Sequence, residues 1–125
     1  MPTIIIIAVI SITSALVFYT FAVWLNWRAK RLELRHLVLF WLGLAADSLG
    51  TGMMRASVEH ITYDLHTLSG YTALFLMLSV TFAGTYAVTR QNEQLRNGFH
   101  KFSVPVWLFW TLSWLTGVVL GIQKF

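Results

Sequence analysis

The stretch TIIIIAVISITSALVFYTFAVWL, residues 3–25, contains no charged residue. A helix needs about 20 mostly apolar residues to cross a hydrocarbon layer about 30 Å thick. The stretch is long enough to do so, and it carries neither the basic leader nor the small-residue cleavage site of a signal peptide. We therefore predict that it is a transmembrane helix.

Three more apolar stretches of similar length follow, at about residues 36–54, 65–89 and 102–122. Pro105 falls in the first turn of the last stretch, where a missing N–H costs little. The sequence predicts an all-α integral membrane four-helix bundle with up-down topology, formed by a single transmembrane domain, residues 1–125.

The composition supports a membrane protein. Hydrophobic residues make up 57% of the 125 residues and charged residues 11%, whereas soluble domains have roughly 45–50% and about 25%. The mean hydropathy is +0.67. The lipid bilayer is therefore the expected surroundings. Cysteine is absent, which excludes disulfides and thiolate metal sites.

The basic residues predict the orientation. Most of the nine Lys and Arg residues lie in the first and third connections between the stretches. The positive-inside rule places these connections in the cytoplasm and both termini outside, in what we expect is a bacterial cytoplasmic membrane. Topology explains this charge, so we predict no nucleic-acid partner. Trp24, Trp27 and Trp41 are expected at the inner headgroup level.

Polar and small residues at helical spacing indicate which face of each helix points into the bundle. They are His36, Phe40, Gly43, Asp47, Gly50 and Met54 in the second stretch; His66, Gly70, Ala73, Met77, Thr81 and Gly84 in the third; and His100, Ser103, Trp107, Trp110, Trp114, Gly117 and Gly121 in the fourth. Each of these three series begins with a histidine.

His36 and His100 both open helices that start at the cytoplasmic face, so they are expected at similar depth. The second and fourth helices of an up-down bundle are diagonal neighbours. Two inward imidazoles at one level could bind the iron of a b-type haem (heme b) from both sides. Gly43 is expected to leave room for the porphyrin edge, and Trp107 and Phe40 to stack on it. The expected partners of the propionates are Arg31, Arg35, Arg96 and Lys101.

Other interpretations of the histidines remain open. A histidine at a helix start is often only an interfacial polar residue. His66 lies nearly a membrane thickness from the other two. It could serve a second, outer site with Met53 or Met54, or only form hydrogen bonds at the outer mouth of the bundle.

Asp47 is the one carboxylate deep in a span, and such residues are costly and frequently functional. It could bind a cation or relay protons. It could equally be a structural centre of hydrogen bonds with Ser48, Thr51, Ser69 or Thr116.

Several stretches together resemble the HsmA family of small four-helix bacterial membrane proteins, named for a haem-sensing membrane protein system. They are Arg35-His36, Phe40-Trp41-Leu42-Gly43-Leu44, Asp47-Ser48-Leu49-Gly50-Thr51, Leu65-His66 with Gly70, Leu76-Met77-Leu78, Phe99-His100-Lys101-Phe102-Ser103 and Val106-Trp107. The resemblance covers nearly the whole chain.

The resemblance implies haem binding in the membrane and sequestration of haem against toxicity and oxidative stress. The resemblance also implies that His36, His66, His100 and Asp47 are the family's motif positions in this sequence. Members often have a further histidine in the middle of the third span, where this chain has Ser79-Val80-Thr81. This departure leaves His36 and His100 as the inner pair.

Four functional interpretations follow. The first is a haem-binding protein that sequesters or handles haem without catalytic turnover. The others are a b-type cytochrome passing electrons between quinol and a membrane redox partner, a small transporter or ion-conducting subunit built around Asp47, and a structural accessory subunit. The sequence leaves a homo-oligomer open. No phosphate-binding loop or nucleophile motif indicates hydrolysis or phosphoryl transfer.

Overall fold

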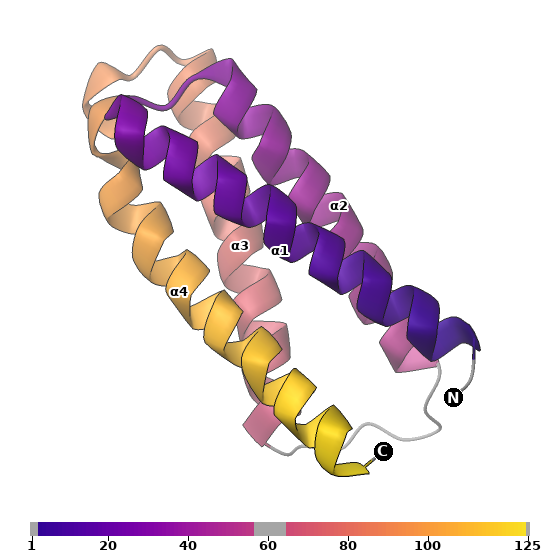
Figure 1. Ribbon diagram of the computed structural model, residues 1–125. Coiled ribbons are helices and arrows are strands. Elements are labelled where there is room, and N and C mark those ends of the chain that lie inside the picture. Colours follow the sequence, from indigo (N-terminus) through magenta and orange to yellow (C-terminus); the bar gives the residue numbers. More distant parts are fainter. Residues whose placement is uncertain (1–2, 57–64, 125) are drawn as a thin grey trace.

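The computed structural model describes residues 3–56 and 65–124, which form four helices (Figure 1). They are α1 (Thr3–Ala29), α2 (Leu34–Ala56), α3 (Leu65–Thr89) and α4 (Glu93–Lys124). All four are long and apolar enough to cross a membrane. The predicted all-α four-helix bundle is therefore confirmed, and the chain has the features of a multi-pass membrane protein.

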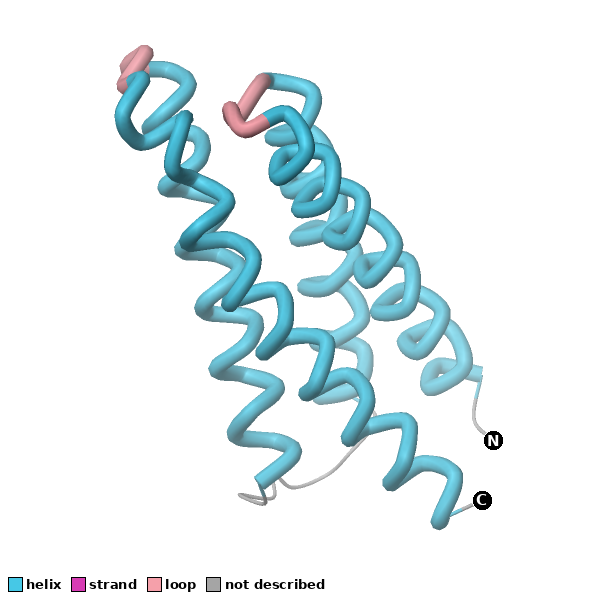
Figure 2. The backbone as a smooth tube through the Cα atoms, turned by 60° about the vertical axis from the view of Figure 1, so that its left-hand side comes forward, coloured by secondary structure: helices cyan, strands magenta, loops and turns pink. Residues whose placement is uncertain are grey.

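The helices form a ring in which each contacts two neighbours. α1 packs against α2 and α4, and α3 packs against the same two helices, so that α2 and α4 are diagonal. The contact between α1 and α2 is the most extensive. The two short connections, residues 30–33 and 90–92, lie at one end of the bundle, and both chain termini lie at the other (Figures 1 and 2).

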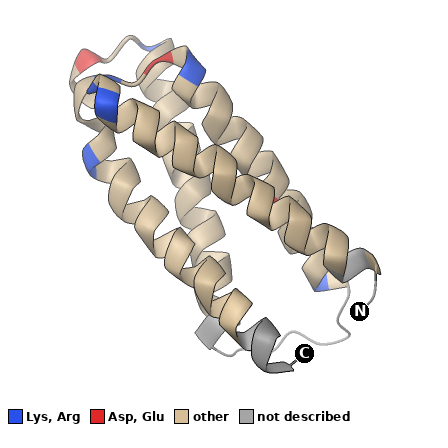
Figure 3. Cartoon of the chain, viewed as in Figure 1, with Lys and Arg blue, Asp and Glu red and all other residues tan. Residues whose placement is uncertain are grey.

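Charged residues gather around the two short connections (Figure 3). We call this the basic end of the bundle, made up of residues 28–35 on one side and 90–101 on the other. Its basic residues are Arg28, Lys30, Arg31, Arg35, Arg90, Arg96 and Lys101, against Glu33 and Glu93. The orientation was predicted from this gathering of basic residues at one end of the bundle.

The helices extend beyond the apolar stretches. α4 begins at Glu93, a full two turns before the apolar stretch, because Asn92 caps it: the Asn92 side-chain oxygen accepts a hydrogen bond from the Leu95 N–H at 3.2 Å. Pro105 is consequently inside α4, and its expected place in a first turn was wrong. Its missing N–H leaves the Lys101 carbonyl without the usual helical donor.

The predicted inward faces are largely confirmed. In α2, the buried residues include His36, Phe40, Gly43, Asp47 and Gly50. In α3, Ala73, Met77, Thr81 and Gly84 are buried, and in α4, Ser103 and Trp110. Polar and small side chains thus face the bundle interior, while the exposed surface is largely apolar, as expected for a protein surrounded by lipid.

Glycines allow α1 to approach α2 closely. A Cβ atom at Gly43 would lie 2.6 Å from the Tyr19 ring, and one at Gly50 would overlap Ile12 and lie 3.0 Å from the Ala8 carbonyl oxygen. A Cβ at Gly52 would meet nothing within 4 Å. Gly43 and Gly50 therefore lie at the contact between α1 and α2, whereas Gly52 does not.

Side-chain hydrogen bonds join each neighbouring pair of helices. Ser11 donates to the Ala46 carbonyl (2.8 Å), Trp41 donates to Thr85 (3.0 Å), Ser69 and Ser113 share a bond (3.2 Å), and Trp107 donates to Thr20 (3.1 Å). Because lipid offers no hydrogen-bond partners, such bonds help to fix which helices meet.

Candidate functional site

His36 lies in the first turn of α2 and is completely buried. The backbone N–H of Glu33 donates to its Nδ1 at 3.0 Å, while its Nε2 is buried and has no hydrogen-bond partner among the described residues. A neutral imidazole whose Nδ1 accepts a hydrogen bond carries its proton on Nε2. In this arrangement Nε2 is therefore a buried donor.

His100 lies in α4, the helix diagonal to α2, and its Nδ1 is also buried without a described partner. Phe40, one turn after His36, makes an edge-to-face contact with Phe99, and their ring centroids are 5.9 Å apart. His100 is the eighth residue of α4, two turns after Glu93, so the expectation that both histidines open their helices was wrong. The contact of Phe40 with Phe99 puts His100 nearer the depth of Phe40, about one turn deeper than His36.

Two further residues near the basic end carry buried polar atoms without described partners. They are both side-chain atoms of Asn26 in α1 and the hydroxyl of Ser103 in α4. Buried polar atoms are nearly always hydrogen-bonded to protein, water or ligand. Asn26, His36, His100 and Ser103 thus each carry a buried polar atom without a described partner, within about three turns of the end of their own helix at the basic end.

Asn26 was not predicted as a site residue. The first apolar stretch ends at Leu25, so Asn26 falls just beyond it. One signal was available: Asn26 continues the helical spacing of Ala15, Tyr19 and Ala22, and all three of these residues are buried.

The room expected for a porphyrin is filled by side chains. The Tyr19 ring occupies the space beside Gly43, so the expectation that this glycine leaves a gap was wrong. Phe40 and Phe99 pack against each other near the histidines. The described cavity of about 70 Å³ touches neither histidine, and small-molecule sites usually begin near 300 Å³.

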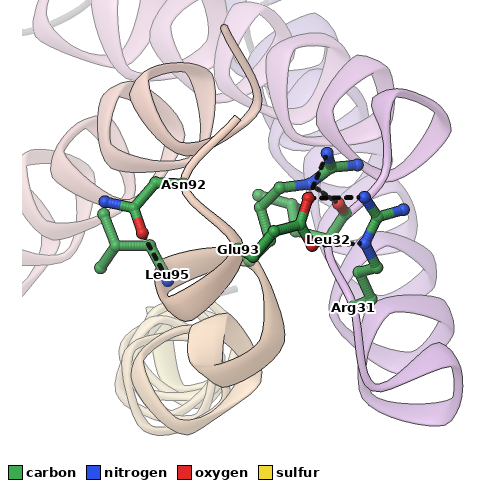
Figure 4. A network of polar contacts seen from close by, with 6 residues as sticks. Arg31, Leu32, Asn92, Glu93 and Leu95 are labelled. Carbon is green, nitrogen blue, oxygen red and sulfur yellow. Dashed lines mark hydrogen bonds and ion pairs between the residues drawn. The ribbon is translucent and has the colours of Figure 1, made fainter. Parts of the chain in front are cut away.

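Three of the four basic residues proposed as propionate partners already have partners, and Figure 4 shows Arg31 beside Glu93. Arg31 donates two hydrogen bonds to Glu93, at 2.9 and 3.0 Å, and these raise the pKa of Arg31 above its ordinary value. Arg96 donates to the Leu32 carbonyl at 2.9 Å and pairs with Glu93 at 3.5 Å. Arg35 pairs with Glu33 at 3.0 Å.

These contacts connect the two short loops with each other. The Leu32 N–H also donates to the Arg96 carbonyl oxygen, at 2.9 Å. The ion pairs are largely exposed, and exposed ion pairs contribute little free energy. A competing carboxylate could therefore replace Glu93 or Glu33 at modest cost. Lys101 is exposed and has no ion-pair partner among the described residues.

Trp107 lies apart from His36. Its indole N–H donates to Thr20 of α1, and its ring lines the cavity between α1 and α4. It lies two turns along α4 from His100. The structure therefore places Trp107 at the contact between α1 and α4. Phe40 instead packs against Phe99.

Asp47 is the centre of a hydrogen-bond network that joins three helices. Trp110 of α4 donates to it at 2.9 Å, Tyr19 of α1 at 3.1 Å, and Thr51 of α2 at 3.4 Å. The sequence suggested Thr51 but missed Tyr19 and Trp110. With three donors on one carboxylate, the geometry favours the structural interpretation of Asp47 over a transport site.

Two predicted site elements cannot be placed. The side chain of His66 and residue Gly121 lie outside the described side chains. Among the described residues, no group of three or more His, Cys, Asp or Glu side chains could hold a metal ion. Haem iron, however, needs only two axial ligands from the protein.

No protein-family model matches the chain, and searches of curated proteins and of solved structures also find no match. The resemblance to the HsmA family therefore stays a prediction carried by the motifs.

Proposed function

We propose that this chain binds b-type haem within the membrane, near the basic end of the bundle, and sequesters it without catalytic turnover. One observation carries the proposal: His36 and His100, on diagonal helices, each have a buried ring nitrogen with no described hydrogen-bond partner. An unsatisfied buried nitrogen costs about 1–3 kcal/mol, and a bond to a metal would remove that cost.

Imidazole is the commonest metal ligand in proteins, and either ring nitrogen can serve. For His36 to bind through Nε2, its proton must move to Nδ1, and the hydrogen bond from Glu33 is then lost. Losing that bond costs about 1 kcal/mol, and the new Nδ1–H then faces the Glu33 N–H, so the two donors must also move apart. When bound, haem supplies an iron centre that two imidazoles would hold in a six-coordinate form.

Haem binding also requires the core to open. Phe40 and Phe99 pack against each other one residue or one turn from the histidines and would have to turn aside. The contacts of α1 with α4 and of α2 with α3 are less extensive than those of α1 with α2 and of α3 with α4. We therefore propose that these two helix pairs separate at the basic end to admit the macrocycle, which requires the contacts of Arg31 with Glu93 and of Arg96 with Leu32 to break.

The experiment is a titration of the detergent-purified protein with haem, followed by absorbance in the Soret region. We expect saturation at one haem per chain. His36→Ala and His100→Ala should each weaken binding at least tenfold, and the double variant should abolish it. His66→Ala is the matched control and should behave like the wild type.

Two results would refute the proposal. One is a wild-type protein that does not saturate with haem. The other is unchanged binding in the His36→Ala, His100→Ala double variant. If instead His66→Ala alone removes the haem, the ligand assignment is wrong and the site is at the other end of the bundle.

A further inference from the structure

A partly open pocket lies between α1 and α4. The contact between these two helices is less extensive than the contact of α1 with α2. The pocket is lined by Thr20, Val23, Trp24, Trp27, Val104 and Trp107, and we call it the tryptophan pocket. Its volume is about 70 Å³. Trp24 and Trp27 are 52% and 42% exposed, so the pocket opens to the outer surface of the bundle. In a membrane, that surface faces lipid.

The pocket leads toward the basic end. Lys30 follows Trp27 by about one turn, and its Nζ lies 5.8 Å from the centroid of the Trp27 ring. On α4, Lys101 precedes Val104 by about one turn. The two lysines therefore flank the same region, at the end of the pocket nearest the headgroups.

The charges of these lysines are not neutralised by the described part of the chain. Glu33 and Glu93 pair with Arg31, Arg35 and Arg96, and none of the described ion pairs involves Lys30 or Lys101. Two free ammonium groups beside an apolar pocket suit a ligand with an anionic head and an apolar tail. Basic clefts between transmembrane helices commonly bind anionic lipid headgroups in this way.

We propose that one acyl chain of an anionic phospholipid lies along the groove between α1 and α4 and inserts a few of its methylene groups into the tryptophan pocket, with the lipid phosphate between Lys30 and Lys101. Tryptophan rings at the headgroup level suit this role, because they combine an apolar body with a polar N–H. A zwitterionic lipid would fit the pocket equally well but would not complement the excess positive charge. The proposal does not rest on haem binding, although Lys101 is also one of the expected propionate partners.

The test is native mass spectrometry of the detergent-purified protein with phosphatidylglycerol or phosphatidylcholine of identical acyl chains. We expect the wild type to bind phosphatidylglycerol about thirtyfold more tightly, since each lysine near a headgroup contributes roughly a factor of five. The double variant Lys30→Gln, Lys101→Gln should lose most of this preference.

The matched control is Arg35→Gln with Arg90→Gln, which removes the same charge at the same end from α2 and from the connection after α3. It should keep the preference. Val104→Phe, which fills the pocket, should weaken binding of both lipids. Equal binding of the two lipids by the wild type would overturn the proposal, as would an equal loss of preference in the double variant and the control.

Discussion

Asp47 shows how much of the bundle depends on one side chain. Its carboxylate is nearly fully buried and accepts hydrogen bonds from Tyr19 of α1 and Trp110 of α4, both at the same oxygen. The diagonal bond to Trp110 spans the core, where the helix backbones themselves do not meet. The network therefore fixes the rotation of α1 and α4 relative to α2.

Two substitutions of Asp47 distinguish the contribution of its size to stability from the contribution of its hydrogen bonds. Asp47→Leu would leave the Trp110 N–H and the Tyr19 hydroxyl without an acceptor, and we expect a loss of about 1–3 kcal/mol in the free energy of unfolding. Asp47→Asn keeps one oxygen for these donors and should lose less than about 1 kcal/mol. Unfolding in mixed micelles measures both variants. A fully stable Asp47→Asn protein without function would favour the transport interpretation.

Gly43 tests the close contact between α1 and α2. Gly43→Ala would force the buried Tyr19 ring to move, and overpacking of this kind costs about 1–3 kcal/mol. Gly52→Ala in the same helix meets no neighbour and should be neutral or slightly stabilising, because alanine favours helix. The same unfolding measurement applies, and equal effects of the two substitutions would contradict the packing described here.

For single residues, the sequence predicted which side chains point into the bundle but not which side chains they contact there. Helical spacing identified His36, Gly43 and Asp47 as inward residues, because polar and small residues are unfavourable toward lipid. That Tyr19 meets both Gly43 and Asp47 depends on the rotation and register of α1. The almost uniformly apolar sequence of α1 gives little information on either. For the same reason the gap expected at Gly43 was wrong.

At the scale of elements, the helix bounds differ from the apolar stretches for a physical reason. Apolar length measures the hydrocarbon layer, whereas a helix continues into the headgroup region until a capping signal stops it. Asn92 starts α4 well before the apolar stretch. Lys30 and Gln91, both with positive φ, end α1 and α3. Asparagine is a known signal for the start of a helix. Lysine and glutamine are not typical residues for positive φ, so the helix ends at Lys30 and Gln91 could not be predicted from the sequence.

The connection between the two short loops makes a prediction about Arg96. Its side chain is 12% exposed and donates to the Leu32 carbonyl, so Arg96→Ala should lower the free energy of unfolding by about 1–3 kcal/mol. Arg31→Ala removes only an exposed ion pair and should cost less than about 1 kcal/mol. Thermal unfolding in detergent compares them. A larger effect at Arg31 would mean that the ion pair, not the backbone contact, holds the loops together.

At the scale of the whole molecule, the orientation follows from the charge at the basic end (Figure 3). We expect this end in the cytoplasm and both termini outside. A cysteine introduced at Asn92 should be protected from impermeant reagents in intact cells, whereas one at Thr62, in the connection outside the described residues, should react. The reverse labelling pattern would place the basic end, with His36 and His100, on the outer side.

The central claim is that His36 and His100 hold one haem from both sides. Electron paramagnetic resonance of the ferric haem-loaded protein tests it most directly, because two axial imidazoles give low-spin iron and the loss of one gives high-spin iron. We predict a low-spin signal for the wild type and for His66→Ala, and a high-spin signal or no haem for His36→Ala and for His100→Ala. A high-spin wild type, or a low-spin signal that survives both single substitutions, would contradict the claim.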